Sequence, residues 1–144
     1  MHTAKHMNTP MMSTLKFSAS ESESFENLKL YKSMVGVLQY PTITCPDLSY
    51  AINRVSQFMH HPTILHWKAV KRILRYLKNT VDKGLVFNKS TDFRLLGFAD
   101  ADWGGDVDDR KSISGYYVFM GCNLNVWKSN KQSKVSRSST EAEY

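Results

Sequence analysis

The spacing of apolar residues changes near Gly84, and this change constrains the fold more than any other feature of the chain. Before Gly84, apolar residues recur every three or four positions, as they do on one face of an α-helix. After it, short runs rich in aromatic and β-branched residues are separated by Gly, Asn, Asp and Ser, as in antiparallel strands joined by turns. The sequence therefore predicts an α/β chain, in which a helical segment is followed by an antiparallel sheet.

This pattern divides the 144 residues into three segments. Residues 1–27 contain Pro10, the Ser- and Glu-rich run 18–24 and few large apolar groups, a composition that predicts a disordered tail or linker. Residues 28–83 form the helical segment, and residues 84–144 form the sheet. Apolar residues make up 42% of the chain, which is enough for a buried core.

The helical segment predicts three helices. The first begins near Leu28 and is stopped by Pro41, and Gly36 weakens it unless another element packs closely there. The second begins at Pro46, which is suited to the first position of a helix. The third spans about residues 64–78.

Five basic residues share one side of the third helix when successive residues are turned by about 100°. They are Lys68, Lys71, Arg72, Arg75 and Lys78. One interpretation places this side along a nucleic-acid backbone, where each neutralised phosphate releases a counterion. The other is a solvated face that keeps the helix soluble. The formal charge of +6 favours polyanionic partners without deciding between the two.

Four β-rich runs follow Gly84, at residues 85–87, 95–99, 115–120 and 125–127, and residues 131–137 are a candidate for a further strand. The hydroxyl groups of residues 138–140 are suited to cap a helix, with Glu141 and Glu143 in its first turn. The order is therefore strands first and a helix last.

Two carboxylates stand where metal ligands are expected in an enzyme that cleaves phosphodiesters. Asp100 ends an apolar run, and Glu143 lies in the first turn of the last helix. Hydrolysis with two metal ions needs acidic oxygen ligands from different elements, because Mg²⁺ prefers carboxylates and water. In the other interpretation, Asp100 solvates a turn and the two glutamates complement the helix dipole. The spacing alone leaves both interpretations open.

Several longer motifs occur together in one order. They are residues 30–40 (LYKSMVGVLQY), Pro46-Asp47, residues 66–77 (HWKAVKRILRYL), residues 101–106 (ADWGGD), Asp109-Arg110-Lys111-Ser112, Lys131-Gln132 and residues 138–144 (SSTEAEY). With these motifs the chain resembles, over nearly its whole length, the Pol polyprotein of copia-type retrotransposons.

The resemblance implies a role for each segment. The helical part corresponds to the region after the reverse-transcriptase palm, and residues 84–144 to the N-terminal half of a ribonuclease H domain, hence an incomplete ribonuclease H-like antiparallel sheet. Asp100 matches the first catalytic Asp and Glu143 the catalytic Glu, both Mg²⁺ ligands for cutting the RNA strand of an RNA–DNA hybrid. Asp102 is a nearby acid rather than a ligand.

The family's later aspartates are expected beyond Tyr144. We therefore expect a truncated ribonuclease H-like domain that is inactive alone, because two carboxylates leave two Mg²⁺ ions with too few ligands. An RNA–DNA hybrid or another nucleic acid remains the expected partner of the basic helix.

A second function belongs to a different class. Residues Arg72, Ile73, Leu74 and Arg75 spell R-x-L-R, the host-targeting motif of secreted oomycete effectors, whose partner is a host plant protein. A retroelement fragment co-opted for that use is the alternative. Residues 1–14 lack the continuous apolar stretch of a signal peptide, and no apolar run is long enough to span a membrane. The sequence therefore predicts an intracellular protein with no membrane partner, and secretion into the host cell under the effector alternative.

Overall fold

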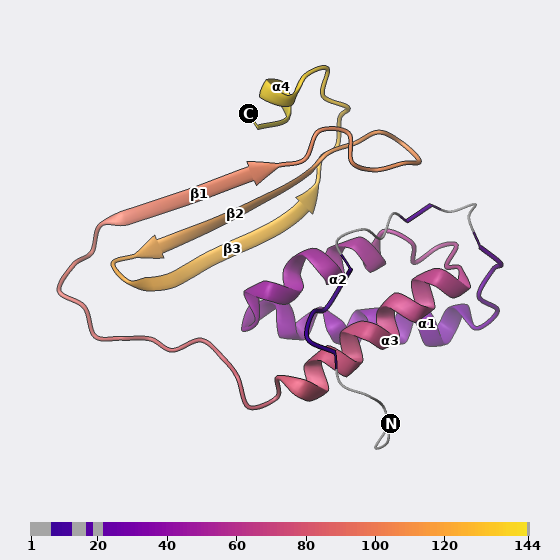
Figure 1. Cartoon of the computed structure of the whole chain (residues 1–144), viewed down its shortest axis with the longest axis horizontal. Helices are drawn as coiled ribbons and strands as arrows, with labels where there is room; N and C mark the ends of the chain where they lie inside the picture. Colours follow the sequence, from indigo (N-terminus) through magenta and orange to yellow (C-terminus); the bar gives the residue numbers. More distant parts are fainter. Residues whose placement is uncertain (1–6, 13–16, 19–21, 144) are drawn as a thin grey trace. The chain divides into compact units, whose positions relative to one another are not determined.

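The computed structural model describes residues 7–12, 17–18 and 22–143. The chain divides into two compact units, Met1–Gly84 and Leu85–Tyr144. Figure 1 shows helices in the first unit and, in the second, a sheet with a short helix. The expected mixed α/β class is confirmed, with helices first and an antiparallel sheet second.

Helix α1 (Leu28–Leu38) begins at a polar cap and ends ahead of the proline that was expected to stop it. The Asn27 side chain accepts a hydrogen bond from the Leu30 N–H at 2.9 Å, which satisfies one of the open donors of the first turn. Gly36 is exposed, and no atom lies within 4 Å of the position that a Cβ would take there. The close packing that would have compensated for this glycine is therefore absent from the described residues around it.

Two 3₁₀ turns, η1 (Tyr40–Ile43) and η2 (Pro46–Leu48), lead into helix α2 (Ser49–Ser56). Helix α3 (Ile64–Asn79) then starts at a capping box. The Thr63 hydroxyl accepts from the His66 N–H at 3.5 Å, while His66 Nδ1 accepts from the Thr63 N–H at 3.0 Å. Thr63 and His66, which precede the first basic residue of α3 in the sequence, thus define where the helix begins.

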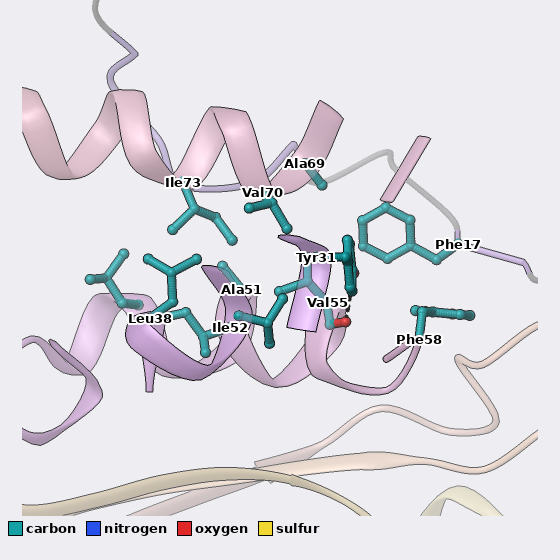
Figure 2. Close-up of a cluster of buried hydrophobic side chains, with 12 residues drawn as sticks. Phe17, Tyr31, Leu38, Ala51, Ile52, Val55, Phe58, Ala69, Val70 and Ile73 are labelled. Carbon is teal, nitrogen blue, oxygen red and sulfur yellow. Dashed lines mark hydrogen bonds between the residues drawn. The ribbon is translucent and has the colours of Figure 1, made fainter. Parts of the chain in front are cut away.

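The core of the helical unit lies where α1, α2 and α3 meet (Figure 2). Its buried members are Phe17, Tyr31, Val35, Leu38, Leu48, Ala51, Ile52, Val55, Phe58, Ala69, Val70 and Ile73. Tyr31 donates a hydrogen bond from its hydroxyl to the Val55 carbonyl at 2.8 Å, and burial raises the pKa of that hydroxyl. The helical periodicity of the sequence is therefore used as predicted, with the apolar stripes facing inward.

Parts of residues 1–27 pack in a way that a mobile tail would not. Phe17 is fully buried, with its ring edge against Phe58 and His66 at centroid distances of 5.8 and 5.2 Å. Further along, the Phe25 N–H donates to the Pro62 carbonyl at 2.8 Å. The remaining residues of the expected tail, 1–6, 13–16 and 19–21, lie outside the described part.

The sheet unit is an antiparallel meander of β1 (Leu95–Ala101), β2 (Ile113–Met120) and β3 (Asn123–Lys131), followed by helix α4 (Ser139–Glu143). Large apolar side chains of these strands remain exposed, among them Leu95 at 71% and Phe98 at 57%. This unit therefore buries little apolar surface and depends on polar contacts more than the helical unit does.

Two strand predictions are wrong. Residues 85–87 form no strand, because no neighbouring strand pairs with them in the described part. The next residue, Asn88, is held by a side chain: Asn123 Nδ2 donates to its carbonyl at 2.8 Å, and its N–H donates to Asn123 Oδ1 at 2.7 Å. Residues 132–137 do not continue the sheet either, since β3 ends at Lys131. The Gln132 N–H instead donates to the Ser112 carbonyl at 2.8 Å, where the chain leaves the sheet.

Candidate functional site

Asp100 lies next to the end of β1, paired in register with Gly115 of β2. Its side chain is exposed. Because successive strand side chains point to opposite faces, Asp100 shares a face with Phe98, whereas Ala101 and its partner Ser114 lie on the other face.

Helix α4 carries Glu143 and packs against β1. The Ser138 hydroxyl accepts from the Glu141 N–H at 3.1 Å, and the Glu141 carboxylate accepts from the Arg137 N–H at 2.7 Å. The first of these contacts confirms the predicted cap, with Ser138 as the capping residue. Ala142 is buried, whereas Glu143 is exposed.

Gln132 connects this helix to the sheet. Its side-chain amide donates to Ser114 Oγ at 2.8 Å and to the Ala142 carbonyl at 2.6 Å, and its Oε1 accepts from the Ser136 hydroxyl at 3.0 Å. Ser114 lies on the face opposite to that of Asp100. Through Ser114 of β2, helix α4 is thus anchored to the face of the sheet opposite to that of Asp100.

The two predicted metal ligands are therefore placed on neighbouring elements, and their catalytic and metal-binding roles remain predictions. Within the described ranges, no three side chains of His, Cys, Asp or Glu gather in a way that could hold a metal ion. Asp102, the nearby acid, has a local role: its Oδ1 accepts from the Ile113 N–H at 2.7 Å. A Cβ at Gly105 would overlap the same carboxylate, so a larger residue there would have to displace the Asp102 side chain.

Asp106 is not among the site residues proposed from the sequence. In the structure its carboxylate is buried, with 1% of the side chain exposed. Its Oδ1 accepts from the N–H groups of Asp108 and Asp109 at 3.0 and 3.3 Å, and its Oδ2 pairs with Lys131 Nζ at 2.9 Å. Burial by itself would raise the pKa of Asp106, but Lys131 and the two backbone donors outweigh it and lower the pKa to about 2.

Lys131 completes this ion-pair cluster by reaching Asp109 Oδ1 at 3.0 Å. Burial would lower the pKa of Lys131, but hydrogen bonds to the two carboxylates outweigh it and raise the pKa. The local signal for Asp106 is that an Asp often accepts from backbone N–H groups two or three residues on. Nothing in the local spacing identifies Lys131 as its partner, because the β2–β3 hairpin separates the two residues in the sequence: Asp106 precedes β2 and Lys131 ends β3.

Helix α3 shows the predicted division between a basic and an apolar side. Lys68, Lys71 and Lys78 are exposed, whereas Val70 and Ile73 on the opposite side are fully buried. Arg72 and Arg75 are half-buried. All five basic residues named from the sequence therefore lie on one helix, and the three lysines are its most accessible charges.

Two residues on or beside the basic side of α3 form hydrogen bonds to other segments of the helical unit. The guanidinium group of Arg72 donates from Nε to the Thr9 carbonyl at 3.2 Å and from Nη2 to the Thr9 hydroxyl at 2.8 Å. Tyr76, beside the basic side, donates its hydroxyl to Asp47, and this hydrogen bond, helped by burial, raises the pKa of Tyr76 to about 12. The Asp47 carboxylate therefore lies beside the basic side of α3, although the sequence of α3 itself contains no acidic residue.

The R-x-L-R residues are part of the same helix. Ile73 is fully buried, and Leu74 packs against the core of the helical unit. Only Arg72 and Arg75 of the four face outward in part. A short recognition motif is expected in an accessible segment, and this one is built into a packed helix.

Comparisons with known proteins identify the family. The chain is 48% identical, over all 144 of its residues, to the retrovirus-related Pol polyproteins from transposons RE2 and RE1 of Arabidopsis thaliana. The chain belongs to the Pol polyproteins of retrotransposons. It spans 10% of the length of these two Pol polyproteins.

Another relative of this Pol segment bears a different name. The chain is 45% identical over 115 residues, 79% of its length, to secreted RxLR effector protein 161 of Plasmopara viticola, and the match covers 81% of that protein. No protein-family model and no solved structure matches the chain. In the part of the Pol segment that the structure describes, no helix is both long and apolar enough to cross a bilayer.

Proposed function

We propose that this Pol segment, of the copia type, binds nucleic acid through the basic side of α3, and that its sheet unit is related to ribonuclease H. The observation that carries the first part is the exposure of Lys68, Lys71 and Lys78 along a helix whose other side is buried. Phosphate oxygens bind such a row of ammonium groups through charge alone. An RNA–DNA hybrid is the partner that the family relationship favours.

The distribution of charge over the two units supports this assignment. Residues 1–84 contain 11 Lys and Arg against 5 Asp and Glu, whereas residues 85–144 contain 8 of each kind. The helical unit therefore carries the whole formal charge of +6. A polyanion is attracted to that unit and not to the sheet unit.

Replacing all three exposed lysines, Lys68, Lys71 and Lys78, by Glu should lower the affinity for a fluorescently labelled RNA–DNA hybrid by about tenfold or more. The slope of log affinity against log salt should become shallower by roughly one for each phosphate that the variant no longer neutralises. Fluorescence anisotropy over a salt series measures both. Reversal of Lys89, Lys128 and Lys134, which are exposed in the sheet unit, changes the net charge equally and is the matched control. Equal decreases in affinity for the two triple variants would contradict the proposed surface.

For the sheet unit we propose a relationship to ribonuclease H, but no efficient cleavage of an RNA–DNA hybrid by this chain alone. Two Mg²⁺ ions need several oxygen ligands that converge on them. Asp100 and Glu143 are two exposed carboxylates, and no third acidic side chain gathers with them in the described part. This donor set does not fit a two-metal site, so we assign no metal-dependent step to the chain.

Incubation of the full chain with an RNA–DNA hybrid and Mg²⁺ should therefore give no cleavage above the rate without protein. Separation of labelled RNA strands on a denaturing gel measures this. Metal-dependent cleavage that disappears in Asp100→Asn would overturn the proposal and restore the catalytic role of that residue.

The effector alternative is weaker. It is favoured by the name of one relative and by the four residues Arg72 to Arg75. Against it stands the position of the motif, whose two apolar residues are taken up by the helical core. A host plant protein as partner and secretion into a host cell are proposals of this alternative alone.

A further inference from the structure

The basic side of α3 is not uniformly open, because Arg72 is already bound within the chain. Both of its hydrogen bonds go to Thr9, which lies 63 positions earlier in the sequence. The Thr9 residue belongs to the described N-terminal segment, residues 7–12, in which Met11 packs against the core of the helical unit. This segment is therefore held beside α3 by an apolar contact and by a polar one.

The chemistry of the polar contact resembles phosphate binding. Nε and Nη2 lie on one edge of the guanidinium group, and this edge offers two parallel N–H donors to a pair of oxygen atoms. In this structure the pair consists of the Thr9 carbonyl and hydroxyl oxygens. Two oxygens of a phosphate group would take the same donors, so the two partners exclude each other.

We infer that Thr9 occupies the phosphate-binding edge of Arg72, so that the N-terminal segment competes with nucleic acid for one position of the basic side. The inference rests on the proposed function of α3 and adds regulation to it. Lys68 and Lys71 bind first, because their side chains are exposed and meet an incoming phosphate directly. Arg72 adds its two hydrogen bonds only after Thr9 has left.

Two substitutions of Thr9 change this competition in opposite directions. Thr9→Val removes the hydroxyl acceptor at similar volume, and should raise the affinity for a labelled RNA–DNA hybrid by about two- to fivefold. Thr9→Asp places a carboxylate beside the guanidinium group, and should lower the affinity by about the same factor or more. Both effects should vanish in an Arg72→Gln background, which has no guanidinium edge to release or to block.

Thr91→Asp, at an exposed position of the sheet unit, gives the same change in net charge and should leave the affinity within about twofold of the original. A readout without nucleic acid is solvent exchange of the Arg72 Nη2 protons, one of which donates to the Thr9 hydroxyl, followed by nuclear magnetic resonance. This exchange should be faster in Thr9→Val than in the original chain.

The outcomes separate the inference from the function on which it rests. Hybrid binding that depends on Lys68, Lys71 and Lys78 but ignores both Thr9 substitutions would leave the proposed function standing and overturn the inference. Unchanged exchange of the Arg72 Nη2 protons in Thr9→Val would overturn it as well. Absence of hybrid binding in every variant would overturn both.

Discussion

The Phe17→Ala substitution should destabilise the helical unit by about 3–5 kcal/mol, the usual cost of removing a fully buried aromatic ring. The ring is 0% exposed and lies edge-on to Phe58 and His66. The guanidinium carbon of Arg54 also lies 5.6 Å from the ring centroid, a distance at which a cation is attracted by an aromatic face. The substitution leaves a cavity and removes all three of these interactions at once.

The free energy of unfolding is best measured by urea titration with Trp67 as the reporter, in a background where Trp103 and Trp127 are replaced by Phe. Trp67 belongs to the helical unit and stacks on Phe25 at 4.8 Å, so its fluorescence follows this unit alone. Tyr40→Ala is the matched control, because Tyr40 is an aromatic residue of the same unit that is 75% exposed. A destabilisation below about 1 kcal/mol in Phe17→Ala would show that the ring does not belong to the core in solution.

The second large effect is expected in the sheet unit, where Asp106→Ala should cost about 3–5 kcal/mol. Removing this carboxylate leaves the Lys131 ammonium without one partner and two backbone N–H groups without their acceptor. The unit has little buried apolar surface to compensate, as the exposure of Leu95 and Phe98 illustrates. Lys131→Met tests the same pair from its other side and should also be strongly destabilising.

The same carboxylate makes the sheet unit sensitive to acid. The pKa of Asp106 is about 2 in the folded chain, below the ordinary value of 3.8 for an aspartate. The stabilisation is therefore complete above about pH 5 and disappears as the pH falls through 4 toward 2, when the carboxylate is protonated. Asp106→Asn should remove most of this dependence, whereas substitution of the exposed Asp100 should not.

Urea titrations at a series of pH values, with Trp103 and Trp127 as reporters in a Trp67→Phe background, separate this effect from the helical unit. Asp100→Ala, at an exposed position of the same unit, is the matched control for the substitution itself, with an expected change within about 0.5 kcal/mol. Similar destabilisation by Asp106→Ala and Asp100→Ala would contradict a special role for the buried carboxylate.

Periodicity predicted the helices well because their apolar stripes serve one shared core. The third helix was expected at about residues 64–78 and is observed at Ile64–Asn79. The burial of Phe17 could not be predicted in this way, because residues 1–27 contain few large apolar groups and Phe17 is not part of a helical or strand period. It depends on a pocket made by residues far along the chain.

Strands were harder to predict because local composition does not reveal a partner. The run at residues 85–87 has strong β propensity, yet no neighbouring strand pairs with it in the described part. In the candidate site, too, local contacts could be predicted from the sequence and long-range contacts could not. The cap at Ser138 followed from local chemistry, whereas the pairing of Asp106 with Lys131 required the sheet register. The roles of Asp100 and Glu143 came from the family resemblance and remain predictions.

Gln132 has a consequence for the local dynamics of the chain. Helix α4 has five residues, and a helix of that length is not stable in water by itself. Its order therefore depends on what holds it, and one side-chain amide donates to Ser114 on β2 and to Ala142 inside the helix. When that amide releases its acceptors, α4 can open locally while the strands stay paired. The orientation of the Glu143 carboxylate thus depends in part on two hydrogen bonds made by a residue eleven positions before it.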